Sequence, residues 1–184
     1  MKKRCEWAKD EPNTKYHDEE WGTPQHDDQK LFEFLILEGA QAGLSWVTIL
    51  KRREGYRKAF SDFDAKKASK YTQKRVEKLL KDESIIRNKL KINSAINNAK
   101  QFLKIQSEFG SFDKYLWAFV NHKPIKNKFK KPFDLPASTE ISEKLSKDLK
   151  KRGFNFVGPI ICYALMQATG MVNDHTSDCY LYKK

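Results

Sequence analysis

Two cysteine–histidine pairs stand near opposite ends of the chain. Cys5 and His17 are 12 residues apart, and His175 and Cys179 are four residues apart. The second spacing predicts that both side chains project from one face of a helical turn. Two thiolates and two imidazoles would make a closed tetrahedral set suited to structural zinc. Nothing local brings the two pairs together, so one shared metal site and four unrelated side chains stay open as alternatives.

The chain has few cysteines and no apolar segment typical of a membrane or secreted protein. Its three cysteines, a low and odd number in 184 residues, argue against a disulfide framework. The basic N-terminus lacks the apolar stretch of a signal peptide, and no run of about 18 apolar residues follows it. We therefore expect a cytoplasmic protein with no membrane partner. Cys162 lies in an apolar run and is interpreted as a core residue.

One carboxylate interrupts an apolar helical pattern. Glu38 shares a predicted helix face with three apolar residues, Leu31, Phe34 and Leu35. Burying a carboxylate there is costly without partners. A local ion pair, or a helix rolled outward, is one interpretation. The other is a pocket acid beside the aromatic residues Tyr16, Trp21 and Trp46, because aromatic walls with one carboxylate suit a flat, electron-poor or cationic ring.

A short basic stretch separates two amphipathic helical patterns. Three cations precede a glycine turn: Lys150, Lys151 and Arg152. The second helix begins just after Gly158, where unpaired backbone N–H groups attract phosphate oxygens. Gly158 has no Cβ, so a phosphate could approach closely. An ordinary helical hairpin with a solvated basic end is the alternative. The stretch resembles a helix-hairpin-helix DNA-binding element, over about residues 141–170.

The positive charge of the chain is unevenly distributed. The net charge is +12, and residues 1–60 carry 11 basic and 11 acidic side chains. The excess lies in residues 61–152, where a polyanion-binding face is one explanation and a generally lysine-rich, soluble surface is the other.

Helices must position these residues, because the apolar pattern is helical and no convincing run of alternating strand residues is present. Gly43, Gly110, Gly153 and Gly170 are expected to end helices, and residues 121–137 to form a loop. Helix N-caps are predicted at the following residues: Asp27 or Asp28, Ser45, Thr72, Ser111 and Ser138.

Together these features resemble the DNA-3-methyladenine glycosylase I family of bacterial alkylation-repair enzymes. The matching blocks span nearly the whole chain in the family's order: 4–7, 16–22, 37–46, 85–88, 117–121 and 150–175.

The resemblance implies an all-α helix-hairpin-helix DNA glycosylase fold, with residues 1–184 as a single domain and a zinc site joining the N- and C-terminal segments. One structural zinc ion would be held by Cys5, His17, His175 and Cys179. The implied base pocket comprises Glu38, Tyr16 and Trp46, with Trp7 and Trp21 nearby. The implied DNA contacts are an intercalating wedge at Leu44 beside Gly43, and backbone contacts at Lys150, Lys151, Arg152 and Gly158.

The implied activity is hydrolysis of the N-glycosidic bond of 3-methyladenine in double-stranded DNA by a monomer that flips the damaged base out of the duplex. Methylation at N3 gives the base a positive charge, so it departs neutral and needs less chemical force. Glu38 is the expected catalytic residue. The position of the aspartate that the wider superfamily uses falls at Asn173, with Asp174 displaced by one residue.

Two segments depart from the family pattern. Members often carry a second tyrosine before Tyr16, where this chain has residues 13–15, Asn-Thr-Lys. The lysine-rich stretch 123–131 is no family signature, and no role is assigned to it. The rival interpretations are a non-catalytic module that grips damaged DNA and an enzyme of the same fold acting on another lesion.

Overall fold

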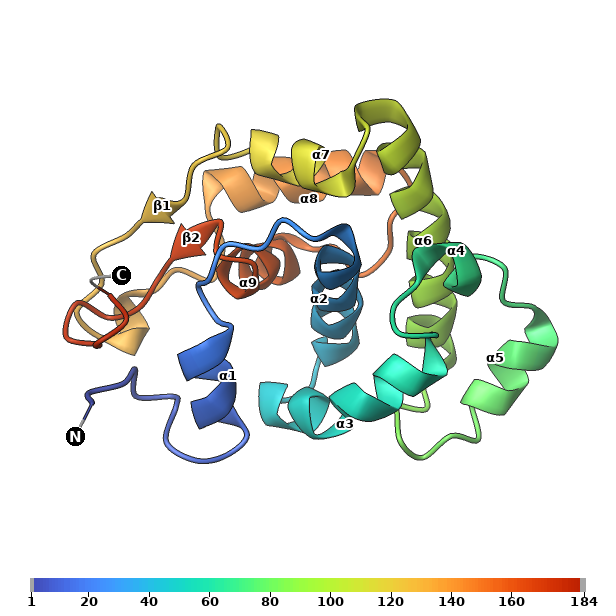
Figure 1. The fold of residues 1–184 in the computed structure, drawn as a ribbon, viewed down its shortest axis with the longest axis horizontal. Coiled ribbons are helices and arrows are strands. Elements are labelled where there is room, and N and C mark those ends of the chain that lie inside the picture. Colours follow the sequence, from blue (N-terminus) through green and yellow to red (C-terminus); the bar gives the residue numbers. More distant parts are fainter. Residues whose placement is uncertain (1, 183–184) are drawn as a thin grey trace.

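A helix buried on all sides, α2 (Asp28–Gln41), runs through the middle of the molecule (Figure 1). The computed structural model describes residues 2–182. Every residue from 31 to 40 is buried, because α2 packs against α3, α6, α7 and α9. The sequence predicted one buried face for this helix, whereas the structure buries every face of it over residues 31–40. Glu38 lies near the C-terminal end of the most enclosed element of the fold.

Helices of varied length surround α2. They are α1 (Asn13–Glu19), α3 (Trp46–Ala59), α4 (Ala65–Ala68), α5 (Gln73–Leu79), α6 (Lys89–Phe109), α7 (Phe112–Ala118), α8 (Glu140–Lys151) and α9 (Pro159–Ala168). The helical fold class predicted from the sequence is confirmed. The short helices α1 and α4 were not predicted, because one or two turns carry too little periodicity to stand out from a loop.

Side-chain caps fix where most of these helices begin. Asp27, Ser45 and Ser111 each accept a hydrogen bond from the backbone N–H three residues later, as predicted. For α8 the prediction of Ser138 was wrong by one residue. Thr139 is the cap, because it and the residue three positions later exchange hydrogen bonds in a capping box.

The predicted loop 121–137 contains structure that the sequence pattern did not indicate. The two-residue strand β1 (Ile125–Lys126) pairs in parallel with β2 (Val172–Asn173). A 3-10 helix, η1 (Pro132–Asp134), follows β1. Strands this short arise from tertiary contact and leave no alternation in the sequence. They dock this segment against the C-terminal part of the chain.

The first and last segments of the described chain lie side by side (Figure 1). The backbone N–H of Tyr180 donates to the carbonyl of Lys3 at 2.8 Å, and Ser177 N–H donates to the carbonyl of Phe129 at 2.8 Å.

None of the helices within residues 2–182 is both long and apolar enough to cross a membrane.

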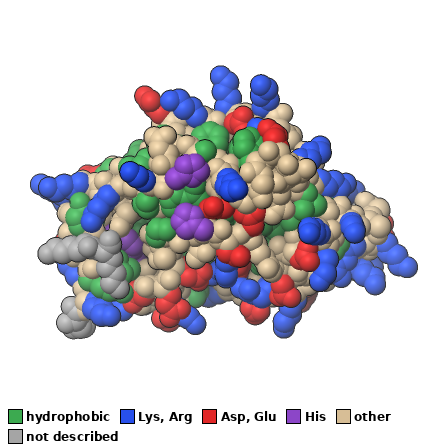
Figure 2. Space-filling model, turned by 45° about the horizontal axis from the view of Figure 1, so that its top comes forward, with side chains coloured by type: hydrophobic (Ala, Val, Ile, Leu, Met, Phe, Trp, Pro, Cys, Tyr) green, Lys and Arg blue, Asp and Glu red, His purple; other side chains and the backbone are tan. Residues whose placement is uncertain are grey.

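Surface charge does not by itself mark a binding face. Figure 2 shows lysine and arginine side chains all around the margin of the visible face, with aspartate and glutamate among them. A binding surface must therefore be located from the geometry of the site.

Candidate active site and metal centre

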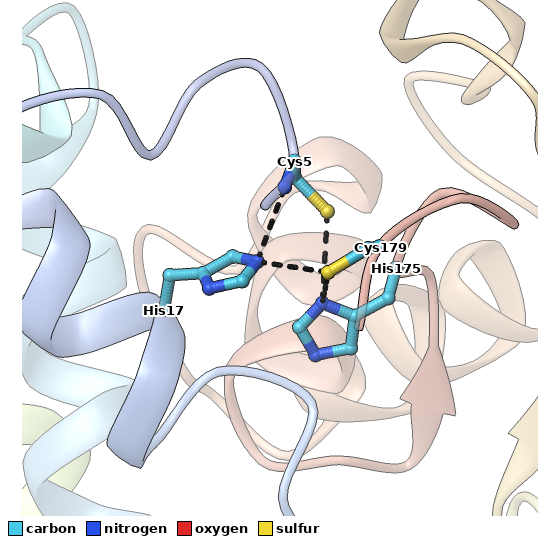
Figure 3. Close-up of side chains that lie close together, drawn as sticks. All are labelled: Cys5, His17, His175 and Cys179. Carbon is cyan, nitrogen blue, oxygen red and sulfur yellow. Dashed lines mark hydrogen bonds between the residues drawn. The ribbon is translucent and has the colours of Figure 1, made fainter. Parts of the chain in front are cut away.

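Four side chains with metal-binding atoms meet where the chain ends come together: Cys5, His17, His175 and Cys179 (Figure 3). All four are buried, and their ligand atoms lie within 4.8 Å of one another. The first pair comes from the N-terminal segment and α1, and the second pair comes from the segment after β2. The two pairs therefore form one cluster, which could hold a metal ion.

The spacing of these atoms matches a tetrahedral ion. Cys179 Sγ lies 3.4 Å from His17 Nε2 and 3.6 Å from His175 Nδ1. Cys5 Sγ lies 3.6 Å from the same Nδ1 atom. Zinc–sulfur bonds of about 2.3 Å and zinc–nitrogen bonds of about 2.0–2.1 Å place tetrahedral S and N ligands roughly 3.6 Å apart. The donor set and its dimensions thus fit one four-coordinate ion.

The prediction that His175 and Cys179 share a helical face was wrong. Residues 174–176 are irregular and a turn follows. The N–H of Cys179 donates to the carbonyl of Thr176 at 2.8 Å, which closes this turn. The turn brings the two ligands together as a helix would, because both geometries fold the chain back over a four-residue interval.

Neighbouring groups orient the two imidazoles. His17 Nδ1 lies 2.8 Å from Asp18 Oδ1, and Arg4 donates to Asp18 in turn at 2.7 Å. His175 Nε2 lies 3.2 Å from the carbonyl of Trp21. These contacts leave His17 Nε2 and His175 Nδ1 facing the thiols.

Burial controls the charge of the cluster. It lowers the pKa of His17 and lowers the pKa of His175 to about 4, so both rings are neutral near pH 7. Burial raises the pKa of the Cys5 thiol to about 11. A thiolate at Cys5 therefore needs a cation beside it, which a bound metal would supply.

A cavity of about 440 Å³ lies beside this cluster. It is lined by all five residues predicted for the base pocket: Trp7, Tyr16, Trp21, Glu38 and Trp46. The aromatic residues come from the N-terminal segment, α1 and the start of α3, and Glu38 comes from α2. The cavity combines apolar walls with one carboxylate, which suits a small planar ligand.

Glu38 is buried with no partner of its own. Its side chain is 4% exposed, and within residues 2–182 it makes no hydrogen bond or ion pair. Burial alone raises the pKa of Glu38 to about 8. The alternatives of a local ion pair or an outward-rolled helix are therefore excluded. The ionised form is therefore disfavoured at this cavity wall, and a cationic ligand beside Glu38 would favour it.

The aromatic wall is continuous with the metal cluster. The Trp7 and Trp21 rings meet edge to face with centroids 5.0 Å apart. Trp7 lies 5.3 Å from the ring of His17, and Trp21 lies 4.7 Å from the ring of His175. The two histidines of the cluster therefore pack behind two residues of the cavity wall.

Tyr16 and Trp46 continue the wall on the other side. Their ring centroids are 5.3 Å apart. Burial, and secondarily the charge of Glu38, raises the pKa of Tyr16 well above its ordinary value. Trp46 Nε1 is buried and unpaired within the part of the chain that the structure describes. Because its pKa is raised, the hydroxyl group of Tyr16 stays protonated and can donate a hydrogen bond.

Four further residues that line the cavity were not predicted from the sequence: Asn13, Gln41, Leu135 and Gln167. Gln41 could have been found, because it stands three residues after Glu38 on α2 and so shares its face. Asn13 stands three residues before Tyr16, but α1 was not predicted. Leu135 lies in an irregular segment and no local signal indicated it.

The turn between α2 and α3 presents a leucine to solvent. Gly43 has φ +75°, a conformation that favours glycine, and no atom lies within 4 Å of the place where a Cβ would stand. Leu44 is 38% exposed. Lys91 Nζ donates to the carbonyls of Ala40 and Ala42 at 2.7 Å each, which fixes the end of α2 beneath this turn.

The predicted hairpin joins α8 and α9, and Gly158 is the N-cap of α9. A Cβ at Gly158 would meet nothing within 4 Å, so the space over this helix terminus is open. Lys150 and Lys151 are exposed. Arg152 differs, because its guanidinium donates to Glu108 and Asp148 at 2.7 Å each and its charge is compensated within the protein.

Helix α6 holds this hairpin in place. Asn98 is 2% exposed and contacts both backbone groups of Asn155. Its Nδ2 donates to the carbonyl and its Oδ1 accepts from the N–H, each at 2.9 Å. This double contact fixes the turn that precedes Gly158.

Asp174 is buried and already occupied. It is 1% exposed and accepts hydrogen bonds from the Tyr163 hydroxyl, from Gln167 Nε2 at 2.8 Å and from Asn127 Nδ2 at 2.7 Å. It does not line the cavity. Its contact with Gln167 instead anchors a residue that does line it.

Comparisons with known proteins agree on one family. The family model for methyladenine glycosylase matches residues 7–182. A DNA-3-methyladenine glycosylase from Haemophilus influenzae is 47% identical over 180 residues, covering 97% of this chain and 97% of that protein. DNA-3-methyladenine glycosylase 1 from Escherichia coli is also 47% identical over 180 residues, covering 97% and 96%.

Solved structures give the same result. A structure of 3-methyladenine DNA glycosylase I from Staphylococcus aureus, concerned with 3-methyladenine recognition, matches with a TM-score of 0.95 at 37% identity. The match covers 98% of this chain and 97% of that chain.

Proposed function

The chain belongs to the methyladenine glycosylase family, and from this premise we propose that it is a repair enzyme that hydrolyses the N-glycosidic bond of 3-methyladenine in alkylated DNA. The observation that carries the proposal is the unpartnered carboxyl of Glu38, which is buried at the wall of an aromatic cavity. A module that only grips the DNA backbone would need no such cavity.

The reaction requires little chemical force from the protein. Water adds to C1′ of the deoxyribose while the bond from C1′ to the base breaks. The bonding electron pair goes to the positively charged base, which leaves neutral, and the water loses a proton to solvent. The products are an abasic site and free 3-methyladenine. The main tasks of the enzyme are therefore to extract the base, to hold it and to admit water.

Glu38 is the residue that distinguishes the charged base from a normal one. The positive charge of the alkylated base favours the ionised form of Glu38 and opposes the rise in pKa caused by burial. The carboxylate then accepts hydrogen bonds from the base edge. A neutral adenine offers no such compensation, so it gains less from the same pocket.

The aromatic residues hold the ring. Trp46 stacks on the base, Tyr16 donates or packs at its edge, and Trp7 and Trp21 close the far wall. The neighbouring rings of the metal cluster limit how far this far wall can move.

Contacts outside the pocket open double-stranded DNA. Leu44, which is exposed beside Gly43, fills the gap left by the flipped base. Gly158 and the first turn of α9 receive a phosphate, and Lys150 and Lys151 add positive charge. Arg152 is not included among these phosphate contacts, because acidic side chains already pair with it.

The metal is proposed to be one structural zinc ion. The four ligands leave no coordination position for water or substrate, and two thiolates with two imidazoles are a common zinc set. The ion would hold the chain ends together and supply folding free energy, without joining the chemistry.

Residues 1–184 are proposed to act as a single domain and a monomer in the cytoplasm. Residues from both the N-terminal and the C-terminal halves of the chain line the cavity, which supports a single domain. The relatives compared above are bacterial, and the chromosome of a bacterium lies in the cytoplasm.

Release of free bases from methylated duplex DNA, resolved by chromatography, tests the activity. We expect 3-methyladenine to be released, and Glu38→Gln to lower its release at least tenfold while the protein stays folded. An exposed exchange such as Glu77→Gln on α5 is the matched control. Release of no base would refute the enzyme, and release of other bases instead would point to a different lesion.

A further inference from the structure

The lysine-rich segment 123–131 is a concentration of uncompensated charge. It holds five lysines and no acidic residue: Lys123, Lys126, Lys128, Lys130 and Lys131. All five are exposed, and none forms an ion pair within residues 2–182. By contrast, Arg152 on the hairpin is paired with two carboxylates. The segment therefore keeps its full charge available for an external anion.

The fold fixes this segment at two points, and its continuation along the chain reaches the cavity. Pairing of β1 with β2 fixes one end, and the carbonyl of Phe129 accepts from Ser177 N–H at 2.8 Å. After η1, Leu135 reaches the cavity and lines it together with Glu38 and Trp46. The lysines consequently lie along a chain segment that ends in the wall of the base pocket.

Along the chain, an exposed aromatic ring stands between the lysines and the residue that lines the cavity. Phe133, in η1, is 77% exposed, which is more than Leu44 at 38%. It stands two residues before Leu135, and Lys131 Nζ lies 5.2 Å from its ring centroid. Exposed aromatic rings among cations are characteristic of surfaces that contact nucleic acid, where bases or sugars pack on the ring.

We propose that residues 123–135 form a third DNA-contacting element, separate from the hairpin and the wedge. The lysines neutralise phosphates of the strand that carries the flipped nucleotide, and Phe133 packs against a neighbouring sugar or base. The inference depends on the proposed function, because a flipped base in the cavity brings its own flanking phosphates to the rim that Leu135 helps to form.

Three of the five lysines are suited to a test. Lys126 and Lys131 lie over aromatic rings, at 4.6 Å from Tyr182 and 5.2 Å from Phe133. Lys123, Lys128 and Lys130 have side chains with no such contact among the described residues. Replacing these three by Gln removes charge without removing a side-chain hydrogen bond, ion pair or ring contact among the described residues.

The experiment is the salt dependence of binding to a duplex with a central tetrahydrofuran abasic-site analogue, measured by fluorescence anisotropy. Each lost phosphate contact should reduce the slope of log K against log salt by about 0.9, so Lys123→Gln/Lys128→Gln/Lys130→Gln should reduce it by roughly 2–3. The corresponding Arg substitutions should keep the slope of the parent protein.

The matched control removes equal charge from the opposite end of the molecule. Lys74, Lys78 and Lys81 are exposed on or beside α5, which lies far from β1 and the chain termini (Figure 1). The triple Gln variant there should leave the slope unchanged. Equal slopes for the loop variant and the parent protein, or an equal drop in the control, would overturn the proposal.

Phe133→Ala separates the apolar contact from the charges. We expect affinity for the same duplex to fall about fivefold or more at every salt concentration, with the slope unchanged. Unaltered affinity would refute the role of the ring. Failure of the parent protein to release 3-methyladenine would instead refute the proposed function, so the two outcomes are distinct.

Discussion

Replacing Glu38 by Gln should change how the stability of the protein depends on pH. Glu38 is buried at the cavity wall without a partner, and burial raises its pKa from 4.5 to about 8. Glutamine has nearly the same shape but does not titrate. The difference in unfolding free energy between the two proteins therefore isolates the ionisation of one carboxyl group.

The magnitude follows from linkage between protonation and folding. Between pH 4.5 and about 8 the folded state keeps a proton on Glu38 that the unfolded state has lost. The folded state thus binds more protons, and its stability must fall as pH rises through this window. Each pH unit costs about 1.4 kcal/mol, so the parent protein loses roughly 4 kcal/mol by pH 8 through this group. Below pH 4.5 the contribution is fully retained.

Urea unfolding between pH 5 and pH 8.5 measures this effect. The advantage of Glu38→Gln over the parent protein should grow by roughly 4 kcal/mol across the range. Effects of other titrating groups and of the metal site cancel in the difference. A difference that stays constant within about 1 kcal/mol would refute the claim that Glu38 is buried and uncompensated in the free protein.

Further exchanges test the parts that support the pocket. Cys179→Ser should abolish stoichiometric metal binding, measured by elemental analysis, and full metal content would rule out the four-ligand site. The same exchange should lower the Tm by roughly 5 °C or more, since a loss of about 2 kcal/mol moves the Tm of a protein this size by several degrees. Lys91→Met should weaken duplex binding about tenfold in anisotropy titrations while the free base still binds, because the turn carrying Leu44 loses its support; equal losses for both ligands would contradict this. Gly43→Ala should cost about 1–3 kcal/mol in urea unfolding because of its positive φ, and a neutral result would exclude that strain.

Local patterns predicted much of the helical framework. Asp27, Ser45 and Ser111 were identified as caps because the side chain and the donor that it satisfies are only three residues apart. Glu38 was identified because a carboxylate among apolar residues at helical spacing is an exception whose cost must be explained. Both inferences use interactions within one element.

Features that depend on distant segments could not be derived in this way. The meeting of Cys5 with Cys179 came from the family resemblance, since no local signal joins the two ends. The contact of Leu135 with the cavity and the ion pairs of Arg152 depend on how separate elements pack. The pairing of β1 with β2 likewise exists only because the chain is already folded.

The contact of the cavity wall with the rings of His17 and His175 has a consequence for synthesis of the protein. Trp21 leaves the ribosome early, but the ring of His175 that supports it lies 154 residues further along the chain. A nascent chain can form its N-terminal helices first, yet its aromatic wall stays without rigid support. The wall of the cavity therefore reaches its final support only after His175 has emerged.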